Sequence, residues 1–159
     1  MKNYGNDCYQ KIYCYEITPA TFEILKENLK NYKNIDFRLK GVGDKEEVLS
    51  LVNHSKSTSA NTVIDSDEKN VIMTTLDTDI KEKITLIKAD IEGFEQKAIE
   101  GAKKHISNDH PKLLISVYHN NEDLWKIPKM IYNISDEYNF YLRYNSSPIY
   151  PTEITLIAV

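Results

Sequence analysis

The 159-residue sequence contains little glycine and little cysteine, and each scarcity argues against a class of protein. Only five glycines occur, and none belongs to the G-x-G-x-x-G motif of dinucleotide-binding proteins. The two cysteines, Cys8 and Cys14, are not accompanied by a second cysteine or histidine pair at zinc-site spacing. Nothing indicates a disulfide framework, so a reducing cytoplasm is the expected environment.

Long apolar runs and an excess of basic charge are also missing. No run approaches the roughly 20 apolar residues that span a bilayer, and the first residues lack the apolar core of a signal peptide. The formal net charge of -4 argues against a protein held to nucleic acid by a general phosphate-binding field. We therefore expect a soluble cytoplasmic protein that binds neither membranes nor nucleic acid, while assembly into a homo-oligomer stays open.

The rest of the composition is that of an ordinary globular protein, with 41% hydrophobic and 28% charged residues. The length suits one domain with a single core, and no repeat or low-complexity linker divides the chain. We predict one domain over residues 1–159.

Strand-like apolar runs alternate with helix-like periods along the chain, which predicts an α/β fold with a largely parallel sheet. A helix is expected to begin at Thr18-Pro19, with the threonine as its cap, and a second to carry apolar residues between Ala98 and Ile106. A third is expected to begin at Pro128. Residues 41–44 are expected to form a loop, and 54–67 a polar excursion. The expected strands cover residues 12–15, 35–39, 48–52, 71–75, 84–89, 113–118, 138–144 and 153–159.

Charged side chains follow several of these strands, and ligands of open parallel sheets collect beyond the carboxyl ends of strands. The residues concerned are Glu16, Asp44, Asp90, Glu92 and His119. Glu16 can accept hydrogen bonds from a ribose, and the alternative is a solvated strand-end acid or a charge favoured by the following helix start. His119 can act as a general base, bind a metal or serve the structure alone.

The turn from Asp90 to Glu95 is the most distinctive of these segments. Three acids crowd a strand-to-helix turn, so their repulsion must be offset by a cation, a ligand ammonium or backbone amides. Gly93 permits a backbone conformation that other residues avoid. Capping of the next helix is the alternative, but a cap needs only one acid.

Taken in order, these segments resemble the FkbM family of methyltransferases. The resemblance runs from about Ile12 onward and is carried by Tyr15-Glu16, residues 43–46, 75–77, 87–95, 101–103, 115–119 and 123–128, and the ending 141–144. It implies an S-adenosylmethionine-dependent O-methyltransferase with a Rossmann-like sheet of the class I type.

The resemblance also implies roles for particular residues. Glu16 matches the acid that holds the cofactor ribose, and Gly43 and Asp44 fall in the loop beside the adenine. Asp90 matches the acid near the methionine portion of the cofactor, and Glu92 lies next to it. The family's opening strand and glycine-rich turn are expected before Glu16, where the sequence has too few residues for them.

For the chemistry, we expect His119 to be the base that deprotonates a hydroxyl on a sugar or another small-molecule acceptor. A divalent metal held by Asp90, His119 and Asn120 is an alternative, by analogy with catechol-type O-methyltransferases. A non-catalytic methyltransferase-like module that acts through a partner is a rival function. A dinucleotide-dependent oxidoreductase is disfavoured by the segments around Asp90 and His119.

Overall fold

The computed structural model describes residues 8–52, 62–64, 70–145 and 153–159, and the chain divides into two compact units. Unit 1 comprises Met1–Gly41 and Glu47–Met73, and unit 2 comprises Val42–Glu46 and Thr74–Val159. Each unit is described by itself below. A single domain over residues 1–159 stays a prediction.

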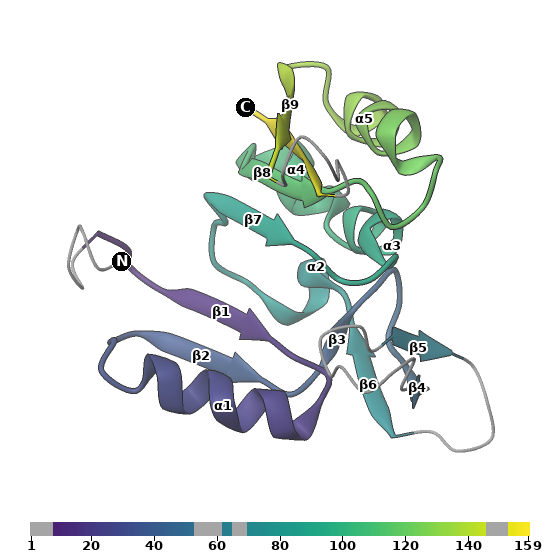
Figure 1. The fold of residues 1–159 in the computed structure, drawn as a ribbon. Helices are drawn as coiled ribbons and strands as arrows, with labels where there is room; N and C mark the ends of the chain where they lie inside the picture. The colour runs from purple at the N-terminus through teal and green to yellow at the C-terminus, as the bar shows by residue number, and fades with distance from the viewer. Residues whose placement is uncertain (1–7, 53–61, 65–69, 146–152) are drawn as a thin grey trace. The chain divides into compact units, whose positions relative to one another are not determined.

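Unit 1 contains a βαβ arrangement in which β1 (Ile12–Tyr15) pairs in parallel with β2 (Ile35–Arg38). The connecting helix α1 (Pro19–Leu29) runs along these strands (Figure 1). Phe22 of α1 contacts Phe37 of β2 edge to face, with ring centroids 6.4 Å apart. The apolar residues spaced along this helix are half-buried rather than fully buried: Phe22, Leu25 and Leu29.

The start of α1 differs from the prediction in one detail. Thr18 occupies the N-cap position, but its hydroxyl does not cap the helix. The Glu16 carboxylate accepts the Thr18 backbone N–H instead, at 2.7 Å. The glutamate lies two residues before the N-cap, where its side chain can reach the Thr18 amide, and its charge is favoured there by the helix dipole.

A second sheet has the strand order β3-β6-β4-β5. Its long strands β4 (Glu47–Val52) and β6 (Val71–Thr74) are antiparallel, and β5 (Thr62–Ile64) pairs with the other edge of β4. The short strand β3 (Gly41–Val42) lies where a loop was predicted. The predicted polar excursion over 54–67 lies outside the described residues, apart from the three that form β5.

Unit 2 is built on a four-stranded sheet of order β7-β8-β10-β9. β7 (Leu86–Ala89) and β8 (Lys112–Ser116) are parallel, whereas β10 (Ile154–Ala158) is antiparallel to both β8 and β9 (Phe140–Tyr144). The closing strands were predicted from the sequence, at residues 138–144 and 153–159. Alternate residues of the inner strands are fully buried, which gives the core of this unit: Leu113, Ile115, Leu156 and Ala158.

The helices of unit 2 are α2 (Leu76–Asp79), α3 (Glu95–Glu100), α4 (Lys103–Asp109) and α5 (Asp123–Ile134). One continuous helix over Ala98 to Ile106 was predicted, and that prediction is wrong, because the chain breaks at Gly101 and Ala102. The Asp77 carboxylate accepts the N–H groups of Lys104 and His105, which satisfies free donors at the start of α4. The expected inward residues are all buried.

Helix α5 begins five residues earlier than predicted, with Pro128 inside it. A proline removes one helical hydrogen bond, but the apolar face outweighs this local cost. Ile127 and Ile131, one turn apart, are both fully buried. In the part of the chain that the structure describes, no helix is long and apolar enough to cross a membrane.

Candidate functional site

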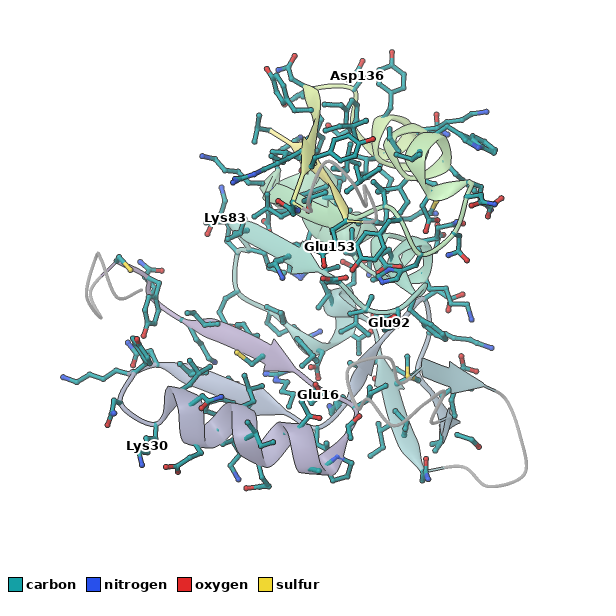
Figure 2. The ribbon with its side chains drawn as sticks, in the orientation of Figure 1. Glu16, Lys30, Lys83, Glu92, Asp136 and Glu153 are labelled. Carbon is teal, nitrogen blue, oxygen red and sulfur yellow. The ribbon has the colours of Figure 1, made fainter. Side chains whose placement is uncertain are left out.

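The clearest candidate site lies in unit 2, where β7 ends and the chain turns into α3. Asp90 directly follows β7, and Figure 2 labels Glu92 in the turn beyond it. Glu92 has a φ of 54° and Gly93 a φ of 96°, so two successive residues adopt left-handed conformations. The expectation for Gly93 is confirmed. A non-glycine residue such as Glu92 pays about 1–2 kcal/mol for this conformation, and such strain often accompanies functional sites.

Glu95, the first residue of α3, is the buried acid of the turn. Its side chain is 0% exposed. Its Oε1 atom accepts the Ile91 N–H at 2.8 Å, and its Oε2 atom accepts the Gly93 N–H at 3.0 Å. Two backbone amides of the turn thus offset part of the negative charge, which is one of the three ways anticipated from the sequence.

His119 supplies a second balancing group, from the segment after β8. Its Nδ1 atom lies 2.9 Å from Oε1 of Glu95. Its Nε2 atom lies 3.6 Å from Oδ1 of Asp90 and 3.5 Å from Oε2 of Glu92. The imidazole is 10% exposed, whereas the carboxylates of Asp90 and Glu92 are 42% and 36% exposed. The structure therefore gathers three predicted site residues, Asp90, Glu92 and His119, around one imidazole.

The electrostatics of this cluster favour a protonated imidazole. Burial acts to lower the pKa of His119, but the hydrogen bond and charge of Glu95, together with the charges of Glu92 and Asp90, outweigh it. The pKa of His119 is therefore raised above its ordinary value of 6.5. A raised pKa makes the imidazole a stronger proton acceptor, which suits a general base.

Tyr118 lies against the same cluster. Its ring is 4.2 Å from the His119 ring, centroid to centroid, and its hydroxyl donates to Oδ1 of Asp90 at 3.0 Å. Burial, followed by this hydrogen bond and the nearby negative charges, raises the pKa of Tyr118 to about 12. The phenol stays protonated at neutral pH and remains a donor that orients the Asp90 carboxylate.

Beyond His119, a second buried acid fixes the chain at the start of α5. The Asp123 carboxylate is fully buried and accepts both the backbone N–H and the side-chain amide of Asn120 through Oδ2, each at 3.1 Å. Its Oδ1 atom accepts the side-chain amide of Gln96 at 2.6 Å. The predicted metal ligand Asn120 thus directs its amide nitrogen to Asp123.

The atoms offered by Asp90, Glu95 and His119 all lie within 4.8 Å of one another, close enough to surround a metal ion. This set shares two members with the predicted one, and Glu95 replaces Asn120. Glu95 already accepts two backbone N–H groups and faces His119, so it has little capacity left for an ion.

A half-open hollow of about 390 Å³ adjoins the cluster, and Asp90 and Tyr118 form part of its wall. Leu114 and Ile157 contribute apolar surface. The remaining lining is polar and comes from the sheet and its ends: Lys88, Ser116, Arg143, Asn145, Glu153 and Thr155. This volume lies in the range of small-molecule sites.

The predicted loop residues Gly43 and Asp44 also belong to unit 2. Gly43 is buried, and its N–H donates to the Thr74 carbonyl at 2.8 Å. A Cβ atom placed on Gly101 would lie 2.0 Å from the Gly43 carbonyl oxygen, so the two backbones touch. Asp44 is exposed. Their role beside an adenine stays a prediction.

Glu16 lies in unit 1, at the end of β1, as Figure 2 shows. Its Oε1 atom accepts the Thr18 N–H, so this acid contacts the start of α1, as the structural alternative to ribose binding predicted. A carboxylate has further acceptor capacity beyond one hydrogen bond. Ribose binding by Glu16 therefore stays a prediction alongside its structural role.

An α/β sheet with charged groups gathered beyond a parallel strand is typical of proteins that bind ligands at the ends of their strands. The Methyltransferase FkbM domain, as a family model, matches residues 5–142. The chain belongs to the FkbM methyltransferase family.

A solved structure agrees with this membership at the level of the fold. The methyltransferase FkbM from Methylobacillus flagellatus KT superimposes with a TM-score of 0.74 at 24% sequence identity. The match covers 94% of this chain and 36% of that chain, so this chain spans about a third of the length of the solved one. The predicted α/β fold is confirmed. A search of the curated proteins gave no match.

Proposed function

We propose that this chain serves S-adenosylmethionine-dependent methyl transfer to a hydroxyl group of a sugar or another small molecule. The observation that carries the proposal is the cluster of Asp90, Glu92 and Glu95 around His119, beyond the end of β7, in a chain of a methyltransferase family. The cluster combines carboxylates that suit a cationic cofactor with a histidine whose pKa suits proton transfer.

The charges of the turn fit the chemistry of this cofactor. S-adenosylmethionine carries a sulfonium and an ammonium, and the half-exposed carboxylates of Asp90 and Glu92 can bind such groups in water-accessible positions. The Tyr118 hydroxyl donates a hydrogen bond to Asp90 and so restricts the rotamers of this side chain before the cofactor binds. Less conformational entropy is then lost on binding. Glu16 and the segment of Gly43 and Asp44 are proposed, each within its own unit, for the ribose and the adenine.

His119 is the proposed general base. When the acceptor oxygen bonds to the methyl carbon, the carbon–sulfur bond breaks, the electron pair stays on sulfur, and the hydroxyl proton must be taken up. Nε2 of His119 faces Asp90 and Glu92, and it receives that proton to give an imidazolium. The three carboxylates around the ring stabilise the positive charge.

The hollow beside Asp90 and Tyr118 supports a hydroxylated acceptor. Its polar lining offers both donors and acceptors, for example Ser116, Arg143 and Glu153, and such mixed lining suits sugar hydroxyls. Leu114 and Ile157 add apolar surface for the C–H face of a sugar ring. A long apolar acceptor would leave these polar groups desolvated and unpaired, at a cost.

Removal of the Asp90 charge is expected to weaken cofactor binding by about 10- to 100-fold, the worth of one hydrogen bond to a charged group. Asp90→Asn keeps an acceptor for the Tyr118 hydroxyl, so the local geometry is preserved. Titration calorimetry with S-adenosylmethionine measures the affinity. Asp136→Asn, at an exposed acid of the same unit, is the matched control and should bind as the parent does. Equal affinities for Asp90→Asn and the parent would remove Asp90 from the cofactor site.

A divalent cation at the cluster is a second proposal, supported by the 4.8 Å grouping of Asp90, Glu95 and His119. Because Glu95 is already committed to N–H donors, we expect a bound ion to be weak and dispensable. Dialysis against EDTA is therefore expected to leave methyl transfer unchanged, with the transfer followed from tritiated S-adenosylmethionine to a panel of methyl hexopyranosides. Loss of transfer that Mg²⁺ or Mn²⁺ restores would establish the metal-dependent alternative.

A further inference from the structure

The start of α3 does not require the carboxylate of Glu95 to be buried. Its side chain is 0% exposed, although an acid at the first residue of a helix can point to solvent and still favour the helix dipole. Burial of an unpaired carboxylate is strongly unfavourable, so the chain must provide hydrogen-bond donors for its oxygens. The identity of its partners therefore indicates what the buried charge is for.

The three partners of Glu95 are all nitrogen atoms. Oε1 accepts the Ile91 N–H and faces Nδ1 of His119, and Oε2 accepts the Gly93 N–H. Because each of its oxygens accepts a backbone N–H, Glu95 has the bonding pattern of an ionised carboxylate, which accepts hydrogen bonds and donates none. The hydrogen atom shared with His119 therefore belongs to Nδ1 of the ring.

This assignment leaves the other ring nitrogen without a proton when the imidazole is neutral. Nε2 is the atom directed toward Asp90 and Glu92, at 3.6 and 3.5 Å. We propose that Glu95 is a positioning residue, which holds His119 in the Nδ1–H tautomer so that Nε2 accepts the proton of the acceptor hydroxyl. The inference deepens the proposed function and rests on it for the identity of the proton donor.

A structural role for Glu95 alone would make a different prediction. The bonds to Ile91 and Gly93 shape the turn, and they would do so whichever tautomer His119 adopts. Only the contact with Nδ1 links the carboxylate to the protonation of the ring. The test must therefore report on the ring and not on the stability of the turn.

Glu95→Gln is the variant that breaks this link with little change in shape. Glutamine can present its amide N–H to Nδ1, which moves the ring proton to Nε2. Asp123→Asn is the matched control, because Asp123 is also a fully buried carboxylate that accepts a backbone N–H, and its described bonds are to Asn120 and Gln96. Both variants are expected to lower the melting temperature, since each removes an acceptor from a buried donor.

Long-range ¹H–¹⁵N NMR of the chain labelled in histidine distinguishes the two tautomers at a pH where the ring is neutral. The parent and Asp123→Asn are expected to show His119 protonated at Nδ1, and Glu95→Gln to lose that species. If Glu95→Gln fails to fold, the parent spectrum still decides, because a ring protonated at Nε2 overturns the proposal.

The same variants separate this inference from the proposed function. The NMR sample contains neither cofactor nor acceptor. The tautomer of His119 is therefore measured independently of whether the chain methylates anything. In the transfer assay, Glu95→Gln is expected to lower kcat by about 10- to 100-fold with KM unchanged. If Glu95→Gln changes the tautomer of His119 but leaves kcat unaltered, Glu95 still sets the tautomer, and the proposed role of this contact in catalysis is refuted.

Discussion

His119→Asn is expected to lower methyl transfer by about 10²- to 10⁴-fold, the usual contribution of a positioned general base. Asparagine can keep a donor toward Glu95 but offers no group that takes up a proton near neutral pH, so the loss reports the base and not the packing. The measurement is the release of S-adenosylhomocysteine from S-adenosylmethionine with a panel of methyl hexopyranosides as acceptors.

The pH dependence provides a second readout of the same residue. A base must be unprotonated, so the parent is expected to lose activity as the pH falls through the raised pKa of His119, and to regain it above. For stability the sign is opposite: a raised pKa in the folded state stabilises the protein below the ordinary value of 6.5, and this contribution is lost as the pH rises through the folded pKa.

The matched control for this prediction is His110→Asn. His110 ends α4 with a left-handed backbone that asparagine adopts readily, and its ring faces Glu137. The control should keep both the rate and the pH profile of the parent. Unchanged turnover in His119→Asn, or an acid limb that persists in it, would exclude His119 as the base.

Gly101→Ala is expected to destabilise unit 2 strongly. The new Cβ atom would lie 2.0 Å from the Gly43 carbonyl oxygen and 3.1 Å from Cβ of Thr75. The first contact is with backbone, which cannot rotate away as a side chain can. The cost should reach at least about 3 kcal/mol, above the typical range for overpacking, or a fall of about 10 °C in melting temperature.

Thermal unfolding followed by circular dichroism measures this effect. Glu100→Ala, at the exposed last residue of α3, is the control and should shift the melting temperature by little. If the chain instead relaxes by moving the Gly43 segment, cofactor affinity should fall while the melting temperature is kept. A variant that retains both properties would show that Gly43 and Gly101 do not pack as described.

The sequence predicted most strands and the inward faces of the helices, because apolar spacing reports burial directly. It missed where helices begin and break. The division at Gly101 depends on Asp77, which reaches the start of α4 from 27 residues away in sequence. The start of α5 depends on the burial of Asp123, Ile127 and Ile131 in the folded unit. Both are tertiary effects that local patterns do not carry.

The candidate site was predicted in outline and missed at its centre. The positions of Asp90, Glu92 and His119 after strands indicated that they share one end of the sheet, and the structure brings them together. Glu95 was assigned no role of its own in the predicted site, yet it is the fully buried member that contacts His119. The crowding of three acids within six residues indicated that one of them has a special environment. The sequence alone does not tell which acid is buried.

The central claim is that the turn beyond β7 and the segment of His119 bind S-adenosylmethionine. Titration of the ¹⁵N-labelled chain with millimolar S-adenosylmethionine, followed by backbone amide shifts, tests it most directly and detects even weak binding. The account predicts saturable shifts at Asp90, Gly93 and His119, with none at Trp125 on the exposed surface of α5. The absence of any shift in the turn, or saturable shifts confined to other segments, would contradict it.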